Sequence, residues 1–439
     1  MKRSIVFVIL INLFLSLTAQ YSVSGGSGMP LLEKDDSENR LKVYLLNGLS
    51  GVRISYESST TDNHQWYRYQ MNANNAVPVP SVQTGNTSYI TDVQDGYGYF
   101  VGLPTHPLTS YVWIIDYSRY FPEFFNLEAL EDDDKCEYLT IITDVEATPL
   151  NYNTPYGFPE NLPRTYRLHY ETLEWDENSK QFFQKEQIVE RSGLISEIPI
   201  KAPLCDTYFT LSGDQFAEYF GFPQAIRSDL YQAVAVEAIG IPETTKEHAI
   251  NELQNTSNAL GGSAPIEYTF NAYANEPVAG LYFWKISQLD STSTNGEMKL
   301  IVRYPGKTLR YNFEQDGVYL VELEVIGRNS VCVNTSQFFN VNIANTVIKI
   351  PNAFSPGSSI GVNDELRISF SSVMSFKASI YNKQGNLLFQ WNDPTKGWDG
   401  RVNGKFVPTG VYYVIVEYKD SSGKSRSMSK AVNILRSKN

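Results

Sequence analysis

Short stretches of alternating apolar and polar residues follow one another along almost the whole chain, with clusters of Gly, Asn, Asp and Pro between them. A side-chain period of two is that of a β-strand with one buried face. The residues between the stretches are those that end strands and form turns. The first block of predicted strands covers 41–46, 52–56, 65–70, 88–93, 97–103 and 111–117.

This first block, 38–120, resembles an immunoglobulin-like sandwich. The segment from Gly96 to Val101, with sequence GYGYFV, is similar to a late strand of that fold, and Trp66 takes the place of its core tryptophan. The paired cysteines of antibody domains are absent. We therefore expect a β-sandwich here that is held by packing.

A second β-rich block is predicted at 135–242, after a break that contains the acidic run from Glu131 to Asp134. The segment from Phe216 to Phe220 follows Asp214, which is a good N-cap, and predicts one or two helical turns. Nothing in this block resembles a particular family. Its strands are expected at 138–145, 165–175, 181–189, 195–200, 208–211 and 231–238.

The polar segment 243–263 is predicted to be a linker with a short helix, and a third block follows at 264–346. In this block an apolar strand carries Trp284, and a later strand begins Gly317-Val318-Tyr319. That pairing resembles a PKD-like sandwich, in which the tryptophan packs beneath the later strand. We expect strands at 266–270, 281–286, 309–313, 318–325 and 337–343, with Trp284 in the core.

The last block, 347–439, carries an ordered set of motifs. It begins Ile350-Pro351-Asn352-Ala353-Phe354, and a Lys-Gly-Trp-Asp-Gly segment and a Thr-Gly-Val-Tyr-Tyr segment lie further on. Along its whole length this block resembles the gliding-motility-associated C-terminal domain, the type B sorting domain of the type IX secretion system of certain Gram-negative bacteria. The residues that carry the resemblance are Pro351, Asn352, Asn363, Asp364, Gly385, Gly397, Trp398, Asp399, Gly400, Gly404, Gly410 and Tyr412.

The resemblance implies a small β-sandwich that the outer-membrane secretion machinery recognises through its loops and an exposed sheet edge. The alternative is that these residues only make the ordinary turns of a small sandwich. At the other end, residues 1–19 have a basic start, a short apolar run and a small residue at Ala19, as in a cleaved signal peptide. Residues 20–37 are expected to be a flexible leader. No later stretch is apolar for long enough to cross a bilayer as a helix.

Charge and cysteine content narrow the classes of partner. The chain carries 36 basic and 48 acidic side chains, which makes nucleic acid an unsuitable partner for its overall field. The three cysteines are Cys136, Cys205 and Cys332, and none has metal-ligand spacing. Because Cys136 and Cys205 fall in one block of an exported chain, a disulfide between them is expected. Three buried free thiols are the alternative.

Catalytic signatures are not found. The four histidines are far apart in sequence, and no phosphate-binding loop, triad or HExxH motif occurs. No cofactor is expected. Calcium at Glu131–Asp134 is the one candidate, and a solvated acidic loop is the favoured interpretation.

The sequence thus predicts an all-β chain of tandem immunoglobulin-like and PKD-like sandwiches with a C-terminal sorting domain. We expect a protein secreted or held at the outer-membrane surface that is not an enzyme and acts by binding an extracellular glycan or protein, as an adhesin or surface component. Two alternatives stay open: a hydrolase or hydrolase accessory with its site in 30–240, and a structural accessory of the secretion and gliding apparatus.

Overall fold

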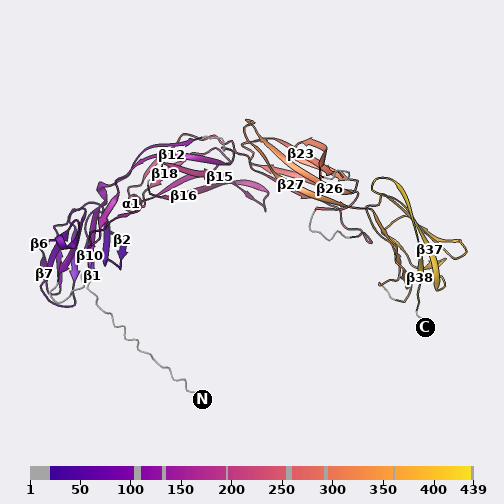
Figure 1. Cartoon of the computed structure of the whole chain (residues 1–439), viewed down its shortest axis with the longest axis horizontal. Helices are drawn as coiled ribbons and strands as arrows, with labels where there is room; N and C mark the ends of the chain where they lie inside the picture. The colour runs from indigo at the N-terminus through magenta and orange to yellow at the C-terminus, as the bar shows by residue number, and fades with distance from the viewer. Residues whose placement is uncertain are drawn as a thin grey trace, which may run out of the picture.

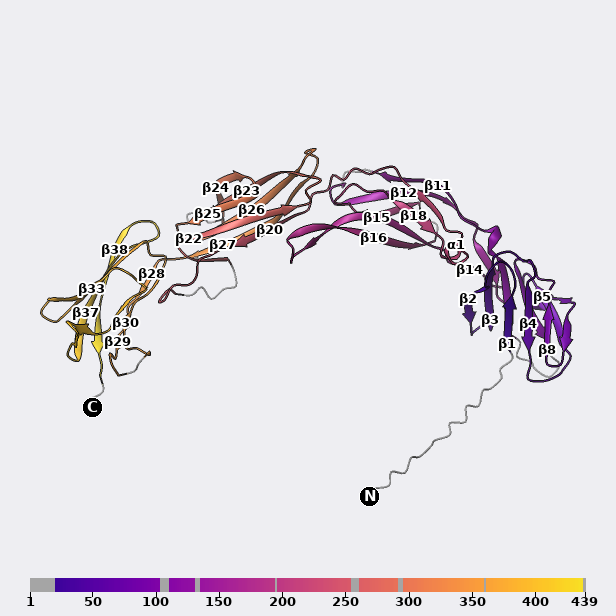
Figure 2. The same ribbon diagram turned by 180° about the vertical axis from the view of Figure 1, so that it is seen from behind.

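The computed structural model describes residues 20–102, 110–130, 135–193, 196–253, 260–290, 295–358 and 361–436. These residues form four β-sandwich units that follow one another in a curved row, with the first and the fourth unit at its opposite ends (Figures 1 and 2). Among the described residues the one α-helix is α1 (Gln215–Tyr219), so the all-β class is confirmed. The expected signal peptide, 1–19, lies outside the described residues.

The first unit is a sandwich of two sheets with Trp66 fully buried between them. One sheet has the order β1 (Gln20–Ser24), β4 (Arg53–Glu57), β8 (Thr87–Ile90) and β7 (Val82–Thr84). The other has the order β2 (Leu31–Asp36), β3 (Leu41–Leu46), β10 (Tyr111–Asp116), β9 (Tyr97–Gly102), β5 (Gln65–Tyr69) and β6 (Val77–Val79).

The larger of these sheets is buried on both faces. Along β10, Val112 and Ile114 point into the core of the first unit, whereas Trp113 and Ile115 point into a second apolar cluster shared with the next unit. Alternating side chains of a strand lie on opposite faces. A continuous apolar run such as this one therefore indicates a sheet that is covered on both sides.

The expectation of a flexible leader at 20–37 is wrong. Strand β1 pairs antiparallel with β4, and β2 pairs with β3. Tyr21 is 4% exposed, and its hydroxyl accepts a hydrogen bond of 2.8 Å from the backbone N–H of Val101. Two aromatic rings, the phenol of Tyr56 and the indole of Trp66, pack against Tyr21 in the core. The Ser/Gly-rich composition of this segment gives no sign that Tyr21 anchors it in the core.

The second unit is also a sandwich, with its own core around Leu168 and Phe209. Its three-stranded sheet has the order β11 (Glu123–Leu130), β12 (Tyr138–Glu146) and β17 (Glu197–Lys201). Its four-stranded sheet has the order β16 (Gln181–Ser192), β15 (Thr165–Asp176), β18 (Thr210–Gly213) and β19 (Gln224–Arg227). A hairpin of β13 (Leu150–Asn153) and β14 (Pro159–Leu162) extends towards the first unit.

The helical turn predicted after Asp214 is confirmed as α1, and the Asp214 carboxylate accepts a hydrogen bond from the backbone N–H of Ala217 at 3.0 Å. The strand predicted at 231–238 is not formed as expected. Only Tyr231 makes an isolated bridge, to Thr207, and the next strand begins at Ala238.

The third unit has Trp284 at 0% exposure in its core, as the sequence predicts. Its three-stranded sheet has the order β20 (Ala238–Glu243), β22 (Ile266–Ala274) and β25 (Thr308–Phe313). Its five-stranded sheet has the order β21 (Leu260–Ser263), β27 (Val333–Ala344), β26 (Gly317–Gly327), β23 (Ala279–Leu289) and β24 (Met298–Pro305).

The structure thus begins the third unit earlier than the expected 264. Strand β20 pairs with β22, and Val234, Val236 and Ala238 are buried in the third core. The expected linker, 243–263, contains the end of β20 and all of β21, and its described residues form no helix. Between β20 and residue 253 the segment forms turns and one isolated bridge, from Glu252 to Phe370 of the fourth unit.

The fourth unit packs Trp398 and Tyr412 between small sheets. Its main sheet has the order β29 (Ala353–Phe354), β38 (Ser425–Ile434), β37 (Gly410–Lys419), β32 (Ser375–Tyr381) and β33 (Leu387–Trp391). Short pairs complete it: β28 (Val347–Lys349) with β31 (Ser369–Ser371), β30 (Leu366–Arg367) with β34 (Gly397–Trp398), and β35 (Arg401–Val402) with β36 (Lys405–Phe406).

Candidate functional site

The motif residues of the fourth unit build its core and its turns. Trp398 is 1% exposed, and its indole N–H donates to the backbone carbonyl of Arg401 at 2.9 Å. The Asp399 carboxylate accepts from the backbone N–H of Arg401 at 3.0 Å, and the Tyr412 hydroxyl donates to the carbonyl of Pro408 at 2.8 Å. These contacts fix the loop around Trp398 on the sandwich.

The remaining motif residues form turns along the same unit. Asn363 has a φ of 55°, and the Asp364 carboxylate accepts from the backbone N–H of Gly361 at 3.0 Å. Gly400 has a φ of 74° and lies so close to Pro356 that a Cβ atom would clash with the proline ring. The other predicted positions lie in turns or strand ends of the same unit: Pro351, Asn352, Gly385, Gly397, Gly404 and Gly410.

The junction between the first and second units, hereafter the closed junction, is filled. Leu41, Tyr69 and Trp113 from the first unit pack in one buried cluster with Leu150 and Phe216 of the second. At its edge the guanidinium of Arg164 pairs with the Asp214 carboxylate at 2.5 Å, and both residues are buried. The Tyr117 hydroxyl donates to the other carboxylate oxygen.

Arg164 also donates to the carbonyls of Tyr120 at 2.7 Å and Thr148 at 2.6 Å. A buried ion pair is stable only where further hydrogen bonds satisfy its atoms, as they largely do here. This cluster joins the first unit to the second through a buried core and a buried ion pair.

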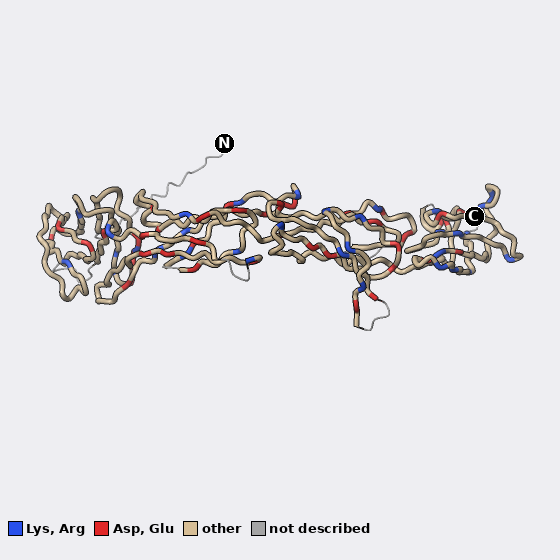
Figure 3. Tube along the Cα trace, turned by 90° about the horizontal axis from the view of Figure 1, so that it is seen from above, with Lys and Arg blue, Asp and Glu red and all other residues tan. Residues whose placement is uncertain are grey.

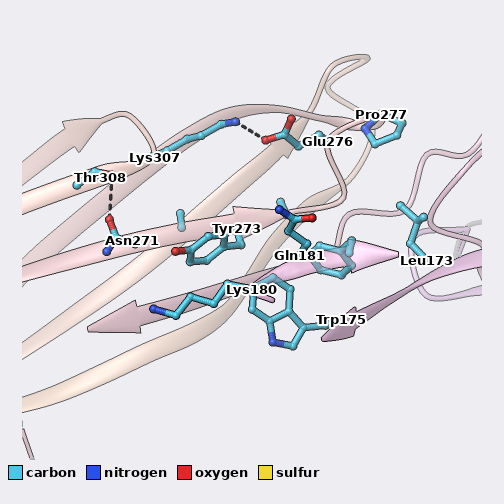
Figure 4. A pocket seen from close by; sticks show the side chains of 13 residues that line it. Leu173, Trp175, Lys180, Gln181, Asn271, Tyr273, Glu276, Pro277, Lys307 and Thr308 are labelled. Atoms are coloured by element: carbon cyan, nitrogen blue, oxygen red, sulfur yellow. Dashed lines mark hydrogen bonds and ion pairs between the residues drawn. The ribbon is translucent and has the colours of Figure 1, made fainter. Parts of the chain in front are cut away.

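The junction between the second and third units is different, because it contains a cavity of about 610 Å³. One wall is the end of the β15–β16 hairpin, and the other is β22 with the start of β25 (Figure 4). We call this cavity the junction groove; the residues that define it here are Trp175, Gln181, Phe182, Asn271, Tyr273 and Thr308.

The hairpin wall is aromatic because of its register. Trp175 on β15 lies directly opposite Phe182 on β16, so both side chains are on one face of the ladder, with ring centroids 5.2 Å apart. Phe182 and Leu173 pack against a small buried cluster of the second unit. Trp175 extends further and meets Tyr273 of the third unit, also at 5.2 Å.

The β22 wall is polar because its outward positions alternate with core positions. Phe270, Ala272 and Ala274 are buried in the third unit, and Asn271 and Tyr273 between them face outward, half buried. Thr308 lies opposite Asn271 on β25, and its hydroxyl donates to the Asn271 side-chain oxygen at 3.0 Å. An aromatic wall thus faces a wall of amide and hydroxyl groups.

Every charged side chain that lines the groove is paired. The ammonium of Lys307 lies 2.6 Å from the carboxylate of Glu276, and that of Lys180 lies 2.7 Å from Glu243. These pairs are exposed, so they add little stability. Their effect on the groove is that it carries no unpaired charge.

The two units around the groove are covalently joined. The expected Cys136–Cys205 bridge is wrong: the disulfide joins Cys136 to Cys332, with a Cα–Cα distance of 5.5 Å. Cys136 lies at the end of the second unit that faces the third, and Cys332 lies in the β26–β27 connection. Cys205 is a buried free thiol, and burial raises its pKa. Membership of one sequence block does not tell which end of a sandwich a cysteine occupies.

Asn275 fixes the same junction from within. It is 0% exposed, and its side-chain amide donates to the carbonyls of Leu204 at 2.9 Å and Ala235 at 2.8 Å. Its oxygen accepts from the backbone N–H of Glu237 at 3.0 Å. The bond to Leu204 joins the third unit to the second, and the bonds with Ala235 and Glu237 hold the segment that connects them.

No group of three or more His, Cys, Asp or Glu side chains that could hold a metal occurs in the part of the chain that the structure describes. The calcium candidate, Glu131–Asp134, lies outside that part. Within the described residues no helix is long and apolar enough to span a membrane.

The fold therefore defines a class of protein, a row of immunoglobulin-like β-sandwiches with a small C-terminal sandwich. Comparison with protein-family models identifies two of the units. Residues 348–432 match the CHU_C type IX secretion signal domain, and residues 128–228 match a fibronectin type III domain. The resemblance of the last block to a type IX sorting domain is confirmed, so this is an exported, secreted or cell-surface protein with fibronectin/immunoglobulin-like units.

Solved structures that the chain matches include the FN1–FN3 domains of chicken CNTN1, with 9% identity, a TM-score of 0.22, and coverage of 70% of this chain and 98% of that one. Two structures of Escherichia coli alpha-2-macroglobulin also match. The elastase-activated form has 8% identity and a TM-score of 0.18, and the native form has 10% and 0.18. Those two matches cover 95% and 96% of this chain, but only 44% and 30% of the macroglobulin chains. No curated protein matches the chain.

Sequence reasoning missed the junction groove. Its residues come from two separate blocks of the sequence, and the pattern around Trp175 is that of an ordinary aromatic strand residue. The one feature that pointed to the groove was the polar residue Asn271 between buried strand residues. The ordinary alternation of a strand explains a polar residue at that position without any site.

Proposed function

We propose that this protein is carried across the outer membrane by its C-terminal unit and acts at the cell surface, or after release, by binding an extracellular ligand in the junction groove. The observation that carries the proposal is the groove itself: a cavity of about 610 Å³ between two units that a disulfide and a buried asparagine hold together. Ligand sites are commonly cavities of this size at domain interfaces.

Binding is favoured over catalysis by the chemistry of the lining. The groove contains aromatic, amide and hydroxyl groups, and its carboxylate and ammonium groups are paired with one another. A general acid or base needs a group that is free to exchange a proton with a substrate. The lining therefore suits recognition, and the hydrolase alternative finds no support in it.

The charge distribution agrees with an extracellular glycan or protein ligand. Positions of Lys and Arg alternate with positions of Asp and Glu along the described part of the chain (Figure 3), and the acidic residues outnumber the basic ones, 48 to 36. Nucleic-acid binding depends on a basic surface to neutralise phosphates.

Export is tested by deleting residues 347–439 in a strain with a working type IX secretion system. The truncated chain should accumulate inside the outer membrane, whereas the full chain reaches the surface or the medium. Equal amounts of both chains outside the cell would contradict the proposed route. A matched control is the full-length chain with Gly423→Ala, which alters a turn of the same unit but no motif residue.

Binding is tested with the purified full chain and a double variant, Trp175→Ala with Tyr273→Ala. Both are applied to immobilised glycan and extracellular-matrix protein arrays, and the wash is assayed for released sugar and peptide. The proposal expects retention of the wild type, loss of retention by the variant, and no released product. Release of product, or equal retention of the variant, would contradict it.

A further inference from the structure

The junction groove presents hydrogen-bonding groups that no other part of the described chain uses. Among the described residues none bonds the indole N–H of Trp175, the hydroxyl of Tyr273 or the side-chain amide of Gln181. Figure 4 shows Gln181 and Tyr273 side by side above the Trp175 ring. Gln181 and Tyr273 line the cavity, so their polar groups are available to a ligand.

The aromatic rings supply the second half of the recognition surface. Trp175 and Tyr273 are only half buried, and their centroids lie 5.2 Å apart with the ring planes tilted by 49°. A tilted pair leaves part of each ring face open. Aromatic rings of this kind give a rigid apolar surface with a polar edge.

The ligand must therefore have an apolar face and a polar rim at the same time. A pyranose ring has this form, since its axial C–H bonds make an apolar face and its equatorial hydroxyls radiate from the edge. The hydroxyls can both donate and accept, which matches the amides of Gln181 and Asn271. A peptide has no such flat C–H face, and a nucleic acid requires cations to neutralise its phosphates.

The ligand is also expected to be uncharged. Lys307 is engaged by Glu276 and Lys180 by Glu243, at 2.6 Å and 2.7 Å. An anionic sugar would have to break one of these pairs to gain a cation, and a cationic one would meet no free carboxylate. A neutral sugar leaves both pairs intact.

We propose that the junction groove binds a neutral saccharide chain, with a pyranose stacked on Trp175 and its hydroxyls bonded by Tyr273, Gln181 and Asn271. This ligand class rests on the proposed binding function and makes it more specific. The groove lies between two units, so the bound chain contacts both sides of the junction.

The test is titration of the purified full chain with maltohexaose, cellohexaose and mannohexaose, followed by calorimetry and tryptophan fluorescence. At least one should bind with 1:1 stoichiometry. Trp175→Ala should weaken that binding roughly 10- to 100-fold, the scale of ring stacking in alanine substitutions. Tyr273→Phe keeps the ring and removes the hydroxyl, so a loss of roughly 3- to 10-fold is expected.

Two controls keep the test decisive. Phe338→Ala removes an aromatic side chain that is 62% exposed on the third unit but outside the groove, and should leave the affinity unchanged. Hexagalacturonate, an anionic sugar chain, should bind at least 10-fold more weakly than the neutral chains. Because Trp175→Ala could also loosen the junction, Gln181→Ala and Tyr273→Phe serve as variants that keep its ring contacts.

The outcomes separate the two proposals. If no neutral hexasaccharide binds, or if hexagalacturonate binds better, the ligand class is wrong. If the double variant then still loses retention on a protein array, the groove remains the binding site for a different ligand. If groove variants lose nothing on any surface, both the ligand class and the proposed function are overturned.

Discussion

The two junctions that flank the second unit both contain aromatic residues, but one is a packed core and the other contains a cavity. The closed junction buries Tyr69 and Trp113 in a continuous core and satisfies a buried Arg164–Asp214 pair. At the junction groove, Trp175 and Tyr273 line a cavity, and a disulfide joins the units on either side. Aromatic residues at a domain boundary therefore have no single meaning. Tyr69 and Trp113 are fully buried and serve packing, whereas Trp175 and Tyr273 are half buried and line a cavity.

The largest expected effect comes from opening the disulfide. A cross-link between residues 196 positions apart lowers the conformational entropy of the unfolded chain. In the chain-entropy model this stabilises the folded state by about 5 kcal/mol. Cys136→Ser with Cys332→Ser should lower the melting temperature of the second and third units and separate their transitions in calorimetry. Cys205→Ala is the control, because that thiol is not in the bridge. A double variant that melts like the wild type would show that the junction does not depend on the bridge.

At the closed junction, we expect the protein to lose stability when the buried ion pair is broken. Arg164→Met leaves the Asp214 carboxylate buried without its cation, which costs about 3–5 kcal/mol. The matched control is Arg167→Met, whose pairs with Glu190 and Glu218 are exposed and should be worth less than about 1 kcal/mol. Urea unfolding of both variants makes the comparison. Equal stability of the two would mean that the Arg164 cluster does not hold the junction.

Truncating one aromatic residue at each junction sharpens the contrast. Tyr69 is 1% exposed, so Tyr69→Ala should cost about 3–5 kcal/mol through lost transfer energy and the cavity left behind. Trp175→Ala removes a half-buried ring and should cost about 1 kcal/mol. Thermal melts test both, and a destabilisation by Trp175→Ala as large as that by Tyr69→Ala would make the groove a packing interface.

The smallest expected effect is that of pH on ligand binding. The hydrogen bond from Lys307 holds the pKa of Glu276 below its usual range, Glu276 raises the pKa of Lys307, and Glu243 raises the pKa of Lys180. The Glu276 carboxylate therefore stays ionised, and the ammonium groups of Lys307 and Lys180 stay protonated, between about pH 5 and pH 9. Saccharide affinity should change less than about threefold over that interval. A steep change would show that a titrating group contacts the ligand.

Local patterns predicted the parts of this molecule that are decided locally. Alternation and turn residues located most strands, Asp214 marked the start of α1, and Trp284 was correctly placed in a core. The motifs around Trp398 identified the sorting unit, which a family model matches. These features depend on residues within one block and on packing within one sandwich.

The features that sequence reasoning missed depend on contacts between blocks. Cys136 pairs with Cys332 because the ends of two units meet there, and no spacing rule encodes that meeting. Residues 20–37 form strands because partners elsewhere in the chain complete their sheets. The junction groove likewise exists only once β15–β16 lies against β22.

Hydrogen–deuterium exchange of the full chain, with and without the hexasaccharide that binds most tightly, tests the central claim most directly. The account predicts slower exchange on both walls of the junction groove, at 173–182 and 271–276, and no change at the closed junction around Leu150 and Phe216. Ligand-dependent protection at the closed junction, or none on either wall of the groove, would contradict it.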